Sequence, residues 1–342
     1  MPVKIFVCAL LALSGFSVTA QRNNDEVLIQ KQSLATASIQ RVDADADAGN
    51  ISVEGVSASD ARVEVYAWSR KNEQETKELF NEFYDLSITP KNGTLVLSAK
   101  RKNRNRNQDI SVSFRVYVPA SASTDLRTNG GNIHCANLSG GIQKVDTRGG
   151  NIAFEDVKGE LSGNTSGGNI SIVRCAETVN VKTSGGNIHT RQSQGKLNLY
   201  TSGGNISLED LSGTIKAETS GGNVGADKVD GTLTTSTSGG NVGLHDLSCA
   251  VDASTSGGNV DVSIVKMGQY VKLANRGSGH TQLRLPADVG IDLDASGHSV
   301  KINPDENFKG DRRERELKGS VNGGGTPVTI DGGDSRVEVN FR

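Results

Sequence analysis

The chain has 342 residues, of which 22% are charged and only 4% are aromatic, and its formal net charge at pH 7 is −2. A nucleic-acid-binding protein would be expected to carry a basic surplus, so this balance argues against nucleic acid as a partner. The scarcity of aromatic residues, beside 41 glycines, fits a narrow core built from small side chains.

Residues 1–20 are predicted to form a cleavable signal peptide and to take no part in the fold. Lys4 supplies a positive start, residues 5–13 an apolar stretch, and residues 18–20 (Val-Thr-Ala) a small-residue cleavage site. The apolar stretch is too short to span a bilayer, and no later segment approaches the roughly 18 apolar residues of a transmembrane helix. We therefore expect an exported protein, periplasmic or extracellular at the cell surface, without a transmembrane segment.

Residues 21–127 are predicted to form an N-terminal β-rich cap that contains one short helix. Alternation of apolar and polar residues predicts strands at 27–29, 50–53, 62–68, 94–99 and 110–118. Asn72 followed by Glu75 is typical of a capping box, and residues 72–86 carry apolar side chains at helical spacing. Seven aromatic residues lie in this region: Tyr66, Trp68, Phe80, Phe83, Tyr84, Phe114 and Tyr117. We interpret them as the bulkier core of a cap, with an aromatic ligand site as the alternative.

A cluster of basic residues lies between two of these predicted strands. Its members are Lys100, Arg101, Lys102, Arg104 and Arg106. Such a cluster is commonly the solvated tip of a hairpin, and the functional alternative is an anion-binding hairpin that contacts lipopolysaccharide or an acidic glycan.

Eight copies of Gly-Gly-Asn dominate residues 128–273. Their asparagines are Asn132, Asn151, Asn169, Asn187, Asn205, Asn223, Asn241 and Asn259, the first two 19 residues apart and the others 18. A short fixed period indicates stacked copies of one unit, and alternation within each copy indicates strands. We therefore predict an all-β protein, a parallel β-solenoid with about 18 residues per coil, right-handed because parallel crossovers strongly favour that hand.

The columns of the repeat predict which side chains face inward. Counted from each asparagine, position +1 holds isoleucine or valine, and position +10 begins with Ile142 and continues with Leu161 and Val179. Both columns are expected in the core, and the Gly pairs are expected to allow positive φ at tight corners. The asparagines are expected to form an internal structural ladder of hydrogen-bonded amides. A threonine column that includes Thr219 is expected to point inward or cap a turn, which argues against an ice-binding face.

Three cysteines follow the predicted leader. Cys135 and Cys175 occupy apolar columns and are expected in the core, whereas Cys249 stands at +8, where other coils carry a turn glycine. Cys135 and Cys175 are two coils apart, roughly 9–10 Å at one strand spacing per coil, which exceeds disulfide reach.

No catalytic, cofactor-binding or metal-binding residues are predicted. Calcium-binding nonapeptide repeats require a recurring aspartate at the turn, whereas the acidic residues here vary between coils. The histidines are scattered, so no zinc site is expected. A polysaccharide-active enzyme of the parallel β-helix type would need carboxylates brought together on one face. The outward columns at +2 and +4 show no such concentration.

Residues 274–342 lose the period and are expected to form degenerate C-terminal coils and a cap. Such a cap would cover the apolar side chains and strand edges at the open end of a solenoid.

Residues 40–342 resemble the bacterial putative-adhesin family of β-strand-repeat proteins, an exported group described as a domain of unknown function. The Ser-Gly-Gly-Asn repeats carry the resemblance, together with the opening Gly49-Asn50-Ile51-Ser52-Val53 and the segment Val116-Tyr117-Val118-Pro119. The resemblance implies a stacked-strand fold and brings no catalytic residues.

Two hypotheses about function follow. The favoured one is a non-enzymatic exported scaffold, an adhesin-like binding module for a cell-envelope component, a glycan or a partner protein. The alternative is the polysaccharide-active enzyme, which clustered outward acids in a groove would favour.

Overall fold

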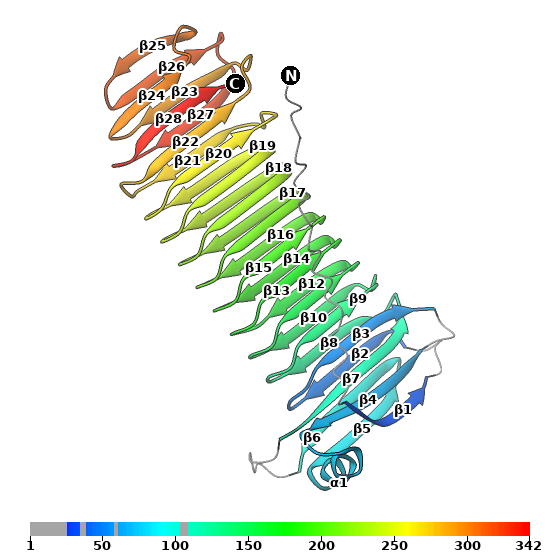
Figure 1. Ribbon diagram of the computed structural model, residues 1–342. Coiled ribbons are helices and arrows are strands. Elements are labelled where there is room, and N and C mark those ends of the chain that lie inside the picture. Colours follow the sequence, from blue (N-terminus) through cyan, green and yellow to red (C-terminus); the bar gives the residue numbers. More distant parts are fainter. Residues whose placement is uncertain (1–25, 35–38, 58–60, 103–108) are drawn as a thin grey trace, which may run out of the picture.

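The computed structural model describes residues 26–34, 39–57, 61–102 and 109–342, and these form one long stack of strands with a helix at one end (Figure 1). The described residues contain one α-helix and 28 strands. All the strands belong to a single hydrogen-bonded sheet that is mostly parallel. The chain winds so that strands alternate between two sides of the stack, and apolar side chains from both sides meet between them.

The middle of the stack is regular. Its strands are β8 (Ser123–Thr128), β9 (Ile133–Ala136), β10 (Ile142–Thr147), β11 (Ile152–Glu155), β12 (Lys158–Asn164), β13 (Ile170–Val173), β14 (Ala176–Thr183), β15 (Ile188–Arg191), β16 (Gln194–Thr201), β17 (Ile206–Thr219), β18 (Val224–Thr237) and β19 (Val242–Thr255). We call the side containing β8, β10, β12, β14 and β16 face 1, and the side containing β9, β11, β13 and β15 face 2. Strands β17, β18 and β19 pass from face 2 to face 1.

Register is the same from coil to coil. Ile170 pairs with Ile152 before it and with Ile188 after it, each 18 residues away along the chain. Equivalent side chains therefore stack in columns, and in β17 the buried apolar ones are Ile206, Leu208, Leu211, Ile215 and Ala217. The expected core position of the +1 column is confirmed.

The first member of the +10 column is an exception. Ile142 is 49% exposed, whereas Gln143 is fully buried and pairs with Leu161 of the next coil. The extra residue in the first, 19-residue interval shifts the count by one, so the expectation of an inward Ile142 is wrong. The buried Gln143 amide is satisfied, since its Oε1 accepts from Thr124 Oγ1 at 2.8 Å and its Nε2 donates to the Ala122 carbonyl at 3.1 Å.

The asparagines connect successive coils by hydrogen bonds. The backbone N–H of Asn169 donates to Oδ1 of Asn151 at 2.8 Å, and the same bond recurs through the repeats. The series begins at Asn50, whose Oδ1 accepts from the Asn132 N–H, and ends where Asn259 Oδ1 accepts from the His280 N–H. The asparagine side chains are exposed, so the expectation that they lie inside the solenoid is wrong.

The threonine column lies inside the stack. Thr219 is buried, its Oγ1 donates to the Gly204 carbonyl of the previous coil at 2.8 Å, and it accepts from the Gly222 N–H at 3.3 Å. The hydroxyl therefore ties two coils and one corner together.

The Gly-Gly pair is needed for close approach of the backbone. A Cβ on Gly204 would lie 1.9 Å from the Gly186 carbonyl oxygen, which is impossible, whereas one on Gly203 would lie 3.6 Å from the Ser184 carbonyl oxygen. Neither residue has a positive φ. The expected positive φ at these pairs is therefore wrong, and only the second glycine of each pair is required sterically.

Positive φ values occur where the chain passes from face 2 to face 1. Asp210 has φ +55° and Gly213 has φ +114°, and equivalent residues of neighbouring coils adopt similar values. Glu177 pairs with Gly159 and Gly195, and it has φ +87° at a position that these coils fill with glycine.

Stacking starts earlier in the chain than the predicted boundary at residue 127. Strands β2 (Arg41–Ala46) and β3 (Ile51–Val56) pair in parallel with β8 and β9, so they already form a coil. The chain then leaves for an inserted layer: β4 (Arg62–Ser69), α1 (Glu73–Phe83), β5 (Tyr84–Lys91), β6 (Thr94–Arg101) and β7 (Ile110–Pro119), with β1 (Val27–Ser33) beside β4.

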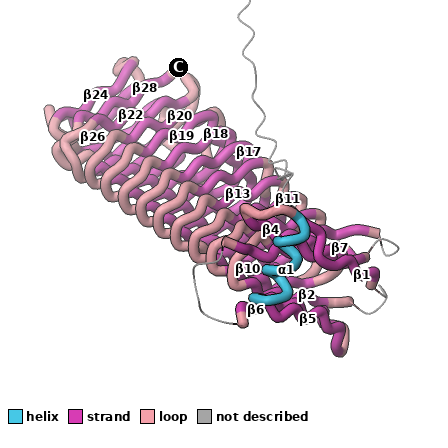
Figure 2. The backbone as a smooth tube through the Cα atoms, turned by 60° about the horizontal axis from the view of Figure 1, so that its bottom comes forward, coloured by secondary structure: helices cyan, strands magenta, loops and turns pink. Residues whose placement is uncertain are grey.

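Helix α1 lies across the N-terminal end of the stack (Figure 2). The Asn72–Glu75 capping box is confirmed, but the helix ends at Phe83 and Leu86 belongs to β5. Phe80 of the helix, Tyr84 and Phe114 are buried. These three aromatic side chains form part of the core at this end.

The C-terminal strands stack out of sequence order. They are β20 (Val260–Ile264), β21 (Val271–Asn275), β22 (His280–Leu285), β23 (Ile291–Ser296), β24 (Ser299–Asn303), β25 (Phe308–Arg313), β26 (Glu316–Val321), β27 (Thr326–Asp331) and β28 (Arg336–Phe341). Strand β27 lies between β21 and β23, and β28 lies between β22 and β24. Strands β25 and β26 continue face 1 as an antiparallel pair.

The two glycines of one corner provide a matched test of the close approach. Gly204→Ala is expected to lower the free energy of unfolding by about 3 kcal/mol, because a methyl group must push two coils apart. Gly203→Ala is expected to change it by less than about 0.5 kcal/mol. Urea denaturation followed by circular dichroism measures both, and equal losses would contradict the assignment.

Glu177 is expected to leave the folded protein less stable than a glycine at the same position would. Replacing it with glycine should raise the free energy of unfolding by about 0.5–1 kcal/mol, because relief of the left-handed backbone outweighs the flexibility that glycine adds to the unfolded chain. The neighbouring Thr178→Gly has no such strain to relieve and should be destabilising. Melting temperatures that fall for both variants would refute the expectation.

Candidate functional site

The basic hairpin predicted as an anion-binding site is only partly described, because Arg104 and Arg106 lie outside the described residues. Lys100 and Lys102 form ion pairs of 3.7 Å with Asp45 and Asp85. Arg101 donates to the Tyr84 hydroxyl at 2.9 Å and to the Ile110 carbonyl at 2.6 Å. The charges of these three residues are thus already engaged, and anion binding by the hairpin stays a prediction.

The outer surface of face 1 carries three shallow hollows that join. The first, of about 330 Å³, and the second, of about 440 Å³, share Asn164 and Lys182. The second shares Arg127 with a third of about 310 Å³ that reaches β6. We call this strip, which runs across the strands from β6 to β17, the face-1 groove.

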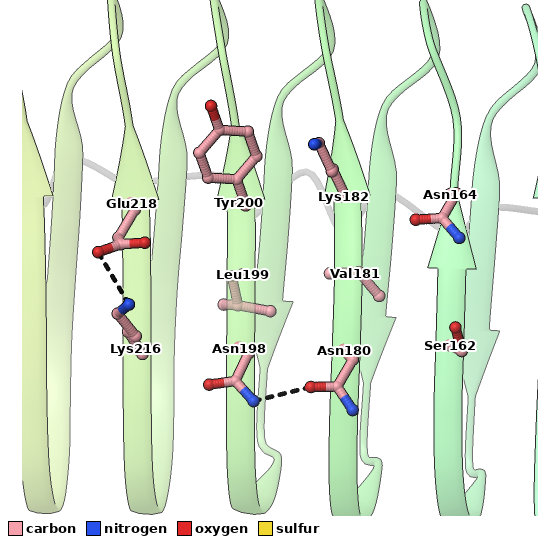
Figure 3. A pocket seen from close by; sticks show the side chains of 10 residues that line it. All are labelled: Ser162, Asn164, Asn180, Val181, Lys182, Asn198, Leu199, Tyr200, Lys216 and Glu218. Atoms are coloured by element: carbon pink, nitrogen blue, oxygen red, sulfur yellow. Dashed lines mark hydrogen bonds and ion pairs between the residues drawn. The ribbon is translucent and has the colours of Figure 1, made fainter.

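Tyr200 stands at the centre of the first hollow (Figure 3). In register it lies between Lys182 of the previous coil and Glu218 of the next. The Lys182 ammonium lies 5.0 Å from the centre of the Tyr200 ring. Hydrogen bonds from Ser202 and then Ser220 hold the pKa of the Tyr200 hydroxyl below its ordinary value. The Tyr200 side chain is half-buried, so part of its ring remains on the surface.

Amide side chains form the floor of the groove. Asn198 Nδ2 donates to Asn180 Oδ1 at 2.7 Å, and Asn164 Nδ2 donates to Asp146 Oδ1 at 3.0 Å. At the far end Lys216 pairs with Glu218 at 3.0 Å. The groove therefore offers hydrogen-bond donors and acceptors at nearly every strand, with one aromatic ring among them.

These residues were not singled out by the sequence analysis, which considered only the outward columns at +2 and +4. The groove residues occupy positions +11 and +13, on the other face of the same coils. The signal is visible in the repeat: Asn180 and Asn198 occupy one column, and Lys182 and Tyr200 the other.

The geometry does not favour a metal site or a catalytic histidine–carboxylate pair among the described residues. Within the ranges that the structure describes, no group of three or more His, Cys, Asp or Glu side chains is placed to hold a metal ion. His280 lies 3.8 Å from Glu338 and His134 lies 3.9 Å from Glu155, and burial lowers the pKa of His134 despite its carboxylate neighbour.

The three cysteines are buried as free thiols. Burial raises the pKa of Cys135 and Cys249 to about 12 and that of Cys175 to about 11. A thiolate is the reactive form of cysteine, so none of these residues is suited to nucleophilic chemistry. Cys249, expected at a turn, instead lies inside the stack.

The fold defines a strand-repeat protein whose apolar interior leaves most of its polar side chains on the outer faces. Residues 39–338 match the sequence profile of the Toastrack DUF4097 family, and the chain belongs to that family. In the described part of the chain, no helix has the length and apolar character that crossing a membrane requires.

Two solved structures are similar to this chain at low identity. A putative cell adhesion protein from Clostridium sporogenes is 8% identical, with 92% of this chain and 98% of that one covered and a TM-score of 0.21. A putative adhesin from Bacteroides fragilis is 15% identical, with 74% and 96% covered and a TM-score of 0.35. No curated protein matches the chain.

The buried thiols lead to a labelling prediction. In the folded protein at pH 8, Cys135, Cys175 and Cys249 should resist alkylation by iodoacetamide, because burial excludes the reagent and the raised pKa suppresses the thiolate. All three should react in guanidinium chloride. Peptide mapping by mass spectrometry distinguishes the sites, and rapid labelling of any of the three in the folded protein would contradict their burial.

Proposed function

We propose that this protein is a non-enzymatic, exported, adhesin-like scaffold that binds a cell-envelope component along face 1. Among the envelope component, glycan and partner protein that the sequence leaves open, the face-1 groove favours a glycan chain. The observation that carries this proposal is the continuous polar strip that contains Tyr200 near its β17 end, with amides from successive coils on its floor.

The chemistry of the groove suits a sugar better than a protein. Protein interfaces have an apolar centre, whereas this groove is lined mostly by amides, hydroxyls and charged groups. An exposed aromatic ring offers an apolar face to the C–H side of a sugar, and neighbouring amides can bond its hydroxyls. The groove crosses eight strands, so at a spacing of about 4.8 Å it extends roughly 34 Å. Many weak contacts along that length add up for a chain ligand.

Export and winding complete the proposal. The predicted signal peptide, residues 1–20, would deliver the protein to the periplasm or the cell surface. We further propose right-handed winding of the coils, with the inserted layer and the C-terminal strands serving as caps.

The polysaccharide-active enzyme receives no specific support from the groove. Its carboxylates are engaged, Glu218 by Lys216 and Asp146 by Asn164. A glycosidase would need one free acid and a second carboxylate across the substrate.

Replacing Tyr200 with alanine should weaken glycan binding about tenfold without changing the melting temperature, because the ring is a surface group. A glycan array of acidic and neutral polysaccharides identifies the ligand, and calorimetry then measures the affinity. Lys272→Ala, outside the groove on β21 of the same face, is the control and should bind like the parent. Equal binding by Tyr200→Ala, or release of reducing sugar during binding, would refute the proposal.

A further inference from the structure

Face 2 carries a separate hollow on the opposite side of the stack. It has a volume of about 480 Å³ and lies over the first halves of β17, β18 and β19. Its walls include Glu209, Asp227 and His245, which are register partners in three successive coils. A hollow of this volume is within the size range of small-ligand sites.

Two glycines form the floor of this hollow. Gly225 and Gly243 are register partners on the outer side of β18 and β19. Neither has a positive φ, and a Cβ on Gly225 would be no closer than 4.0 Å to a neighbouring atom. Glycine inside a strand is destabilising, and nothing in the fold requires it here. Other coils place larger side chains in this column, such as His189 and Asp261.

Asp227 has an unsatisfied oxygen at the hollow. Its Oδ1 is enclosed, and within the described ranges it has no hydrogen-bond partner. An enclosed carboxylate oxygen without a donor carries a desolvation cost, and a cation close to the carboxylate would offset it. His245 folds toward the floor, since its Nε2 would lie 3.7 Å from a Cβ on Gly243.

The charges at the hollow favour a cation. Neither Glu209 nor Asp227 forms an ion pair within 4.0 Å among the described residues, unlike Glu218 of the face-1 groove. Arg191 is the register partner of Glu209 on the side away from the hollow. Asp227 is therefore the negative group of the middle coil, and the two glycines lie between its column and the exposed Asn223 and Asn241.

We propose that this hollow is a second binding site, distinct from the face-1 groove, and that it takes an amino sugar. The flat floor of Gly225 and Gly243 receives the C–H face of the sugar ring. Asp227 accepts from the ring's ammonium group and Glu209 accepts from a neighbouring hydroxyl, while Asn223 and Asn241 line the opposite side of the glycine floor.

Calorimetric titration of the full chain with a glucosamine tetrasaccharide tests the proposal, and the N-acetylglucosamine tetrasaccharide serves as the matched neutral ligand. The parent should bind the amino form at least about tenfold more tightly than the acetylated form. Raising the salt concentration should weaken that binding, because charge attraction at the surface is screened.

Variants locate the site. Gly225→Thr fills the floor with a residue that suits strands, so it should abolish binding while the melting temperature stays equal or rises. Asp227→Asn keeps the shape and should remove the preference for the amino form. Ser171→Thr, in the same outward column on β13, and Tyr200→Ala, on face 1, should bind like the parent.

Several outcomes would overturn the proposal: unchanged binding by Gly225→Thr or Asp227→Asn, equal affinity for the acetylated ligand, or no binding of the glucosamine tetrasaccharide. Loss of this binding in Tyr200→Ala would also overturn it, because the ligand would then lie on face 1. If Gly225→Thr fails to fold, Asp227→Asn decides. A failure here leaves glycan binding in the face-1 groove to its own test.

Discussion

At every Gly-Gly-Asn corner, the backbone of one coil lies directly against the backbone of the next. The second glycine allows this contact because it has no side chain. A Cβ on Gly204 would lie only 1.9 Å from the Gly186 carbonyl oxygen of the previous coil. Two polar residues hold the corner at that distance. The threonine hydroxyl bonds a carbonyl of the previous coil from inside, and the asparagine side chain accepts an N–H of the next coil from outside. The corner is therefore tied on both sides of the chain, and the spacing of the whole stack depends on it.

Because the corner and the buried columns hold the stack, the outward residues between them can vary without loss of the fold. Face 1 uses this freedom for amides, lysines and Tyr200, whose neighbours come from successive coils. Face 2 uses it for two glycines and for Asp227. Both surfaces are assembled from residues about 18 positions apart, so neither forms a compact motif in the sequence. The protein presents chemistry as strips and shallow hollows, and that geometry suits extended ligands.

Period and alternation were enough to predict the regular coils, the inward columns and the capping box at Asn72. Three features escaped for physical reasons. The 19-residue first interval reverses which of Ile142 and Gln143 faces the core, and a count from the asparagine cannot reveal where the extra residue is absorbed. The coil of β2 and β3 pairs with β8 and β9, but the inserted layer separates the two coils along the sequence. Asn50 and Asn132 are 82 positions apart and therefore look unrelated. The groove was overlooked because only the face-2 columns were inspected, although positions +11 and +13 carry a readable pattern.

The placement of β27 and β28 bears on the order in which the structure can be completed. From β8 to β22 the coils can be added one after another, because each strand pairs with the equivalent strand of the coil before it. The next positions in the stack belong to β27 and β28 rather than to β23 and β24. Strands β23 and β24 therefore have no neighbour on the side of the stack until residues about 30–40 positions later have emerged and inserted between them and the stack. A chain that emerges N-terminus first would grow steadily through most of its length and then pause, with one end of the sheet open, until a single late insertion closes it.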